Sequence, residues 1–352
     1  MKRILPAFLS CQGYRLSDDE KRLFSKYNPL GVCLFSKYCA NIQSRAQVRA
    51  LVSDIKEAVG RDDVLIAVDQ EGGRVRRLLE PEFTAVTSQQ SINSEELAEQ
   101  HAYLISSDLK DCGINVNFAP VLDIMTEKTS NVLQGRCFDN NVAELGRSMV
   151  DEYIKNGVCP CIKHMPGHGK AMVDPHLELP VISDSLENLQ QDFAPFKALH
   201  DAPMGMAAHI VLTAVDAQNA VTVSSKAVKE IIRDEIGFTG LLVSDAIIMK
   251  SLKGSIAQKT HQSVDAGCDV ICLGNADFEA NVQLCESGIE ISDEAEERLQ
   301  KVREIISVIG DFSQYKQIEN KYCANLKNII TYNYDYDATE VLNRLHSDDM
   351  GG

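Results

Sequence analysis

Residues 64–70 read VLIAVDQ, in which five apolar residues are followed at once by an acid and an amide. The apolar part has no polar alternation, so it predicts a strand buried on both faces, as in a parallel sheet covered by helices. Short apolar runs of the same character occupy residues 4–10, 31–36, 114–121, 158–164, 203–211, 240–246 and 268–274. The sequence therefore predicts eight buried strands.

Segments with the apolar spacing of helices lie between these runs. Several begin on a serine and end beside a glycine, which are the preferred helix-capping residues. The predicted helices cover residues 17–27, 43–59, 94–112, 141–156, 185–200, 224–236 and 255–266. Eight strands alternating with helices predict an α/β protein with a (β/α)₈ TIM barrel. An open doubly wound sheet, which normally has fewer strands, is the alternative.

Length and composition indicate one large globular domain with an extension. The chain has 352 residues, of which 44% are hydrophobic and 24% charged, and this excludes disordered and fibrous classes. We expect a single barrel domain over 1–310, ending in an amphipathic helix at 289–309. Residues 311–352 are polar and tyrosine-rich, with a weak helical pattern at 337–346, and are predicted to be a C-terminal helical extension that is peripheral or partly disordered.

The charge balance argues against several classes of partner. Lysine plus arginine number 35 and aspartate plus glutamate 51, so the net charge is −16, and binding to nucleic acid or an anionic membrane is not expected. The eleven cysteines form no CxxC pair, and many lie within apolar runs, which predicts reduced thiols and a cytoplasmic location. The N-terminal apolar stretch is short and interrupted by Pro6, so no membrane span is predicted there. The oligomeric state is not indicated.

Ionisable residues stand at the ends of four of the eight predicted strands. Asp69 ends one run, Lys163 and His164 end a second, and His209 and Asp245 belong to two others. In a (β/α)₈ barrel the residues that follow the strands gather on the face where active sites are found. Any one of these groups could be an ordinary hydrogen-bonded core or loop residue. Their recurrence at strand ends favours a site.

The densest polar stretch is KHMPGHGKAMVDPHLELP, residues 163–180. It has no clear periodicity and is rich in glycine and proline, which is typical of a functional loop. Its histidines, His164, His168 and His176, suggest zinc. However, a proline and a glycine separate the first two, so these cannot form a helical zinc pair, and the HExxH motif is missing. We therefore expect no metal and no organic cofactor.

Five ordered motifs carry a resemblance to a known family. They are VDQEGGRVRRL (68–78), NVNFAPVLDI (115–124), QGRCF (134–138), KHMPGHGKAMVDPH (163–176) and GFTGLLVSDA (237–246). Together they resemble the β-N-acetylglucosaminidases of glycoside hydrolase family 3, over about residues 4–275. The resemblance implies a (β/α)₈ barrel that removes terminal, non-reducing β-linked N-acetylglucosamine with retention of configuration.

The resemblance also implies the catalytic roles. Asp245 would be the nucleophile, because an ionised carboxylate can form a glycosyl ester that water then cleaves. His176 would be the proton donor and acceptor, with Asp174 as its partner, because a neighbouring carboxylate raises the pKa of an imidazole and orients its ring. The alternative to a catalytic role is that Asp245 only caps a helix. Likewise, the DPH segment (174–176) could be a surface loop without a role.

The sugar-binding residues follow from the same resemblance. Charged groups placed around a pyranose make strong hydrogen bonds that distinguish one hydroxyl from another. The aligned positions are Asp69, Arg77, Arg136, Lys163 and His164. Arg77 could instead only pair with Glu71 or Glu80. By the resemblance, His168 and His209 are structural or lie behind the site.

The expected substrate is a small carbohydrate. The resemblance implies muropeptides, chiefly N-acetylglucosamine joined to 1,6-anhydro-N-acetylmuramic acid, in peptidoglycan recycling. The alternatives are a β-N-acetylglucosaminide phosphorylase, a β-glucosidase on the same barrel, and a sugar-binding barrel without activity. The family's β-glucosidases usually add a second domain, for which the residues after the barrel are too few.

Three positions depart from the family pattern. Ala246 follows Asp245 where many relatives have a second acid, Pro175 stands where serine is common, and Lys170 replaces a small or acidic residue. Because proline fixes its backbone φ, Pro175 stiffens the loop between Asp174 and His176. These departures bear on loop mobility and rate, and leave the type of reaction unchanged.

Overall fold

Eight parallel strands form a barrel at the centre of the computed structural model, which describes residues 3–36, 39–173 and 179–327. The strands are β1 (Leu5–Leu9), β2 (Pro29–Cys33), β3 (Leu65–Val68), β4 (Val116–Asn117), β5 (Cys159–Met165), β7 (Met204–Ala207), β9 (Leu241–Ser244) and β10 (Ile271–Cys272). Their order is β10-β1-β2-β3-β4-β5-β7-β9, and a parallel bridge between Val243 and Val270 joins the two ends. The predicted TIM barrel is confirmed, and the open doubly wound alternative is wrong.

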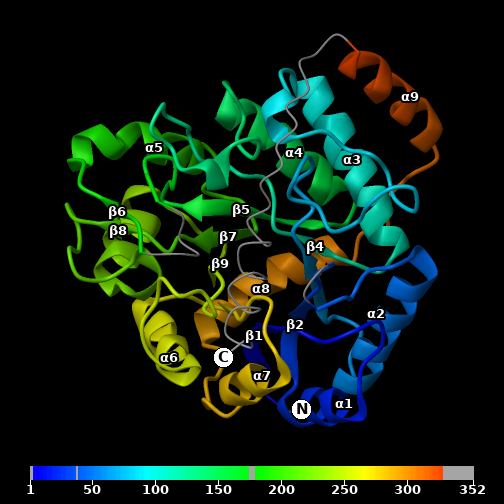
Figure 1. Ribbon diagram of the computed structural model, residues 1–352, viewed down its shortest axis with the longest axis horizontal. Helices are drawn as coiled ribbons and strands as arrows, with labels where there is room; N and C mark the ends of the chain where they lie inside the picture. The colour runs from blue at the N-terminus through cyan, green and yellow to red at the C-terminus, as the bar shows by residue number, and fades with distance from the viewer. Residues whose placement is uncertain (1–2, 37–38, 174–178, 328–352) are drawn as a thin grey trace, which may run out of the picture.

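Helices surround the barrel (Figure 1). They are α1 (Asp18–Tyr27), α2 (Arg45–Val59), α3 (Glu95–Asp111), α4 (Val142–Lys155), α5 (Leu186–Ala198), a π-helix (Ala227–Glu235), α6 (Ile256–Ala266), α7 (Phe278–Cys285), α8 (Asp293–Ile306) and α9 (Tyr315–Leu326). Short 3₁₀ turns occur at Gln89–Ser91, Asn131–Leu133 and Val221–Val223, and β6 (Val181–Ile182) pairs with β8 (Val211–Leu212) outside the barrel. All eight predicted helical segments contain a helix, whereas α7 and α9 were not predicted.

Local capping explains where the helices begin. Ser17 accepts a hydrogen bond from the Glu20 backbone N–H, and the Glu20 carboxylate accepts one from the Ser17 backbone N–H. Ser255 and Gln258 form the same reciprocal pair at the start of α6. Each pair satisfies two backbone donors that a helix start would otherwise leave without a partner.

The barrel interior is filled by alternate residues of each strand. In β3, Leu65 and Ala67 point inward and belong to the interior cluster, while Ile66 and Val68 face the surrounding helices. Helix α8 closes the end of the barrel at which the strands begin, since Leu299 is fully buried in the interior cluster with residues from the strand starts. The barrel is therefore solid at that end and has no pore.

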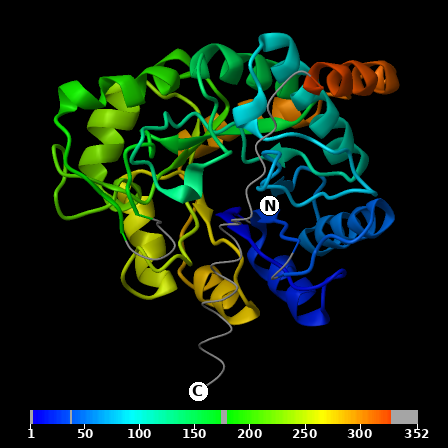
Figure 2. The same ribbon diagram turned by 45° about the horizontal axis from the view of Figure 1, so that its top comes forward.

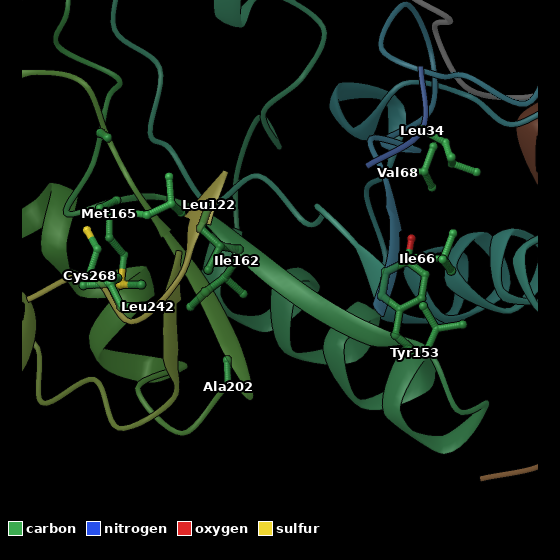
Figure 3. Close-up of a cluster of buried hydrophobic side chains, with 14 of the residues drawn as sticks. Leu34, Ile66, Val68, Leu122, Tyr153, Ile162, Met165, Ala202, Leu242 and Cys268 are labelled. Carbon is green, nitrogen blue, oxygen red and sulfur yellow. The ribbon is translucent and has the colours of Figure 1, made fainter. Parts of the chain in front are cut away.

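A second apolar layer lies between the strands and the helices. Its members include Leu34, Ile66, Val68, Leu122, Tyr153, Ile162, Met165 and Leu242 (Figure 3). Tyr153 of α4 is fully buried there, and its hydroxyl accepts a hydrogen bond from Asn117 of β4. This layer attaches the helices to the strands and so gives the strand ends a rigid support.

Helix α9 lies outside the ring of helices and packs against α3 (Figures 1 and 2). Its Tyr322 is fully buried and joins the main hydrophobic core. The weak helical pattern expected at 337–346 lies outside the described residues. Within the residues that the structure describes, no helix combines the length and the apolar character needed to cross a membrane.

The tight packing of β1 to β3 generates a stability prediction at Gly31. A Cβ atom at this position would lie 2.5 Å from the Leu65 carbonyl oxygen and 2.6 Å from the Phe8 ring. We expect Gly31→Ala to reduce the free energy of unfolding by about 1–3 kcal/mol or more, since overpacking forces the strands apart. Urea unfolding followed by circular dichroism measures this, and a stabilised variant would contradict the packing.

Candidate active site

A cavity opens at the carboxyl ends of the barrel strands, and strand alternation determines which side chains reach it. Residues 65 and 67 of β3 point inward, so Asp69 also points inward; the same parity directs Lys163 after Cys161 in β5 and Asp245 after Val243 in β9. The lining of the cavity includes Asp69, Arg77, Arg136, Lys163, His164 and Asp245. Thus six of the eight site residues predicted from the sequence lie together. Asp174 and His176 lie outside the described residues.

Four charged residues form the centre of the site. The Lys163 ammonium lies 2.8 Å from an Asp69 carboxylate oxygen and 2.7 Å from one of Glu71. Arg136 donates two parallel hydrogen bonds of 2.8 Å to the two oxygens of Glu71. Among the described residues Arg77 pairs with Asp69, at 3.6 Å, while Glu71 pairs with Arg136 and Glu80 with Arg76, so the alternative pairing is wrong. Glu71 thus holds both Lys163 and Arg136.

The neighbouring charges in this cluster determine the protonation state of each group. Burial alone would raise the pKa of Glu71, but the neighbouring Arg136 and Lys163 outweigh it and hold that pKa far below its usual range. Burial would likewise lower the pKa of Lys163, and Asp69 and Glu71 reverse this shift and raise it. At neutral pH the cluster therefore presents a charged ammonium and guanidinium with paired carboxylates, a set of donors and acceptors suited to a polar ligand.

Asp123 organises the two histidines at the other side of the cavity. Its carboxylate lies 2.7 Å from His164 Nδ1 and accepts the backbone N–H of His168 at 2.6 Å. Burial would raise the pKa of Asp123, but His164 and His168 outweigh it and lower that pKa. Because an ionised carboxylate only accepts hydrogen bonds, His164 must carry its proton on Nδ1. The Lys163–His164 peptide that leads into this segment is cis.

His168 also lines the cavity and is almost completely buried. Among the described residues neither of its ring nitrogens has a hydrogen-bond partner. Burial lowers its pKa to about 4, so the ring is neutral at pH 7 and can both donate and accept a hydrogen bond. The sequence analysis assigned His168 a structural place or one behind the site. The structure places its buried ring at the wall of the cavity, and its role stays a prediction.

Asp245 lies at the rim of the cavity, directly after β9. Its backbone N–H donates to the Ala207 carbonyl at 3.1 Å, and its Oδ1 accepts the N–H of Ala246 at 2.7 Å. His209, fully buried behind it, is 3.1 Å from the Ala246 carbonyl. Backbone contacts on both sides therefore fix the position of this carboxylate.

Glu71 and Asp123 are the polar residues of the site that the sequence analysis did not select. Asp123 follows the β4 strand by a few residues, so the strand-end rule that selected Asp69 and Asp245 could have found it. No comparable sequence pattern indicated that Glu71 belongs to the site. It lies two residues after Asp69, beyond the end of β3, and is followed by a turn at Gly72, which has a φ of 97°.

The chain resembles known proteins over most of its length. Residues 6–307 match the profile of the glycosyl hydrolase family 3 N terminal domain. The chain is 35% identical over 287 residues to the β-hexosaminidase of Bordetella avium, covering 77% of this chain and 80% of that protein. It is 33% identical over 315 residues to the β-hexosaminidase of Nitrosomonas eutropha, covering 85% and 88%.

The fold also resembles that of a protein with a solved structure. The crystal structure of NagZ from Neisseria gonorrhoeae in complex with N-trifluoroacetyl-D-glucosamine superimposes with a TM-score of 0.80 at 28% sequence identity. The match covers 92% of this chain and 98% of that one.

Neutralising Glu71 tests the charge cluster. We expect Glu71→Gln to reduce the free energy of unfolding by about 3–5 kcal/mol, because Lys163 and Arg136 lose the carboxylate that compensates their burial. Urea unfolding at pH 7 measures this. Glu80→Gln, which removes a part-exposed pair with Arg76, is the control and should cost less than about 1 kcal/mol. Equal losses in the two variants would contradict the role of Glu71.

Two buried histidines predict how stability depends on pH. Burial lowers the pKa of both His101, in α3, and His168 to about 4, against 6.5 in an unfolded chain. Between pH 6.5 and 4 the unfolded state binds protons that the folded state does not, so stability is present above pH 6.5 and falls as the pH falls. The loss is up to about 3 kcal/mol for each histidine. Urea unfolding from pH 7 to 4.5 should show this slope, and His101→Gln should flatten it.

Proposed function

The chain belongs to glycoside hydrolase family 3 and is a glycosidase, and from this premise we propose that it is a retaining β-N-acetylglucosaminidase. The observation that carries the proposal is the cavity in which Asp245 faces a set of charged hydrogen-bonding groups at the carboxyl ends of the strands. The names of the relatives support it: two are β-hexosaminidases, and the solved enzyme binds a derivative of glucosamine.

Asp245 is the proposed nucleophile. Its carboxylate attacks the anomeric carbon of the bound sugar, the bond from that carbon to the glycosidic oxygen breaks, and a glycosyl ester forms on Asp245. The Ala246 backbone N–H donates to Asp245 Oδ1 at 2.7 Å and holds the carboxylate at the end of β9. A fixed carboxylate serves this step because the attacking atom must already lie near the anomeric carbon.

His176 is the proposed acid and base, with Asp174 as its partner. In the first step His176 gives a proton to the leaving glycosidic oxygen. In the second it takes a proton from water, which attacks the anomeric carbon and releases Asp245 as a carboxylate. Two successive inversions give a sugar with the original β configuration. The proposal for this pair rests on the sequence resemblance, with its motif following the described site residues Lys163 and His164.

The sugar is held by the charged groups of the cavity. Lys163 and Asp69 lie 2.8 Å apart and offer a donor and an acceptor side by side, which matches two neighbouring hydroxyl groups of a pyranose. Arg77, Arg136 and His164 supply further donors around the same space. Because these groups are buried and already paired, they need little rearrangement on binding, which favours affinity.

The proposed natural substrates are muropeptides in which N-acetylglucosamine is joined to 1,6-anhydro-N-acetylmuramic acid, cleaved during peptidoglycan recycling in the cytoplasm. The cysteines support a reducing compartment. All eleven are free thiols, ten of them are buried, and burial raises the pKa of Cys33 and Cys272, which line the cavity, so that these thiols stay protonated.

The release of p-nitrophenol from p-nitrophenyl β-N-acetylglucosaminide tests the reaction. We expect cleavage of this substrate and little of the corresponding β-glucoside. Asp245→Asn should lower kcat at least about 10⁴-fold, since it removes the nucleophile while keeping the shape of the side chain. Unchanged thermal unfolding of the variant is the control for folding.

Product analysis separates the proposal from its rivals. In water the first-formed product should be the β anomer of N-acetylglucosamine by NMR, and in phosphate buffer the free sugar should still form in place of the sugar 1-phosphate. An α product, a sugar phosphate or substantial activity in Asp245→Asn would overturn the mechanism. Binding of N-acetylglucosamine without any cleavage would identify a barrel that has lost activity.

A further inference from the structure

Helix α9 reaches the active-site region although it lies outside the barrel. It begins at Tyr315, beyond residues 6–307 that match the family profile. Most of its surface is polar, but Tyr322 is directed inward and is completely buried. Its ring lies beside His101 of α3, with ring centroids 6.0 Å apart. A tyrosine hydroxyl in such a place requires a polar partner.

A short chain of hydrogen bonds leads from this hydroxyl to Glu71. The Thr87 backbone N–H donates to the Tyr322 oxygen at 3.0 Å, and that oxygen lies 2.9 Å from His101 Nδ1. On the other side of the ring, His101 Nε2 lies 3.0 Å from the Glu71 carbonyl oxygen. The same residue, Glu71, holds Lys163 and Arg136 through its side chain.

The chemistry of the partners fixes the direction of each bond. A carbonyl only accepts, so His101 must carry a proton on Nε2 and donate it to Glu71. The ring is neutral, because burial holds its pKa near 4, and so Nδ1 has no proton and accepts. The Tyr322 hydroxyl therefore donates to Nδ1 while its oxygen accepts from Thr87. Removing this hydroxyl leaves His101 Nδ1 buried without a donor.

The backbone around Glu71 is held from two directions. Asn117 of β4 bonds both the N–H and the carbonyl of Gln70, each at 3.0 Å, while His101 bonds the carbonyl of Glu71. The next residue, Gly72, leaves no space for a Cβ atom, which would meet the Thr87 carbonyl and approach His101 Cε1 to 2.7 Å. The His101 ring therefore packs closely against this turn.

We propose that Tyr322 is a positioning residue for sugar binding, acting through His101 on the backbone of Glu71 and so on the placement of Lys163 and Arg136. The inference rests on the proposed function, since it assigns those two cations to the sugar. It makes α9 part of the active-site support, so that an element beyond the family domain sets the affinity of the site.

The test is Tyr322→Phe, which keeps the ring and removes only the hydroxyl. We expect KM for p-nitrophenyl β-N-acetylglucosaminide to rise about 3- to 10-fold with kcat within about twofold of wild type, because contacts with sugar hydroxyls exist in both the ground and the transition state. A merely structural role would instead reduce the folded fraction, which lowers apparent kcat and leaves KM unchanged.

Tyr315→Phe is the matched control. Tyr315 lies on the same helix, and its hydroxyl is 2.6 Å from Thr84 Oγ1, in the same loop that contains Thr87, but it makes no bond to His101. Both variants lose one hydroxyl between α9 and this loop. We expect Tyr315→Phe to lower the midpoint of urea unfolding and to leave KM unchanged.

The outcomes separate the two proposals. If the wild-type enzyme cleaves the substrate and Tyr322→Phe has the wild-type KM, the positioning role is overturned while the function stands. If the wild-type protein cleaves nothing, the proposed function fails. Crystal structures of the wild-type protein and of Tyr322→Phe then test the positioning role. A displacement of Glu71 or Lys163 by more than about 0.5 Å would support the positioning role, and an unmoved site would overturn it.

Discussion

The alternation of side chains along closed parallel strands is the constraint on which this structure depends. Inside the barrel there is room only for every second residue, and over most of each strand these residues are apolar and pack into one another. The first inward residue beyond the packed region is exposed to the cavity. Asp69, Lys163 and Asp245 occupy this position on three strands, so the same periodicity builds both the core and the site.

The second requirement is that charges removed from water are paired with charges of opposite sign. Two cations and Glu71 are buried beside the partly exposed Asp69, which is tolerable only because each charge has close partners of opposite sign. Glu71 is central to this balance, since it contacts both Lys163 and Arg136. The cluster is consequently rigid and charged before any ligand arrives, and its placement depends on the backbone supports provided by Asn117 and His101.

The sequence predicted the barrel well because each strand is a short, continuous apolar run and each run ends in a polar residue or a turn. It also predicted the residues whose position follows from strand parity. Glu71 and Asp123 were not selected, and Glu71 lies in the turn after β3, which has no periodic signal. Helix α9 was missed for a similar reason: it is largely polar, and Tyr322 is its one fully buried residue. Asp174 and His176 remain predictions.

The packing of α8 beneath the barrel has a consequence for the shape of molecules that can be processed. Leu299 and its neighbours fill the barrel at the end where the strands begin, so among the described residues the cavity is closed at its base. A polysaccharide cannot thread through it, so only a chain terminus can be inserted, and the remainder of the molecule must stay outside. Under the proposed function, the enzyme would release its product after each bond it breaks, and a longer chain would be shortened in separate binding events, one sugar at a time.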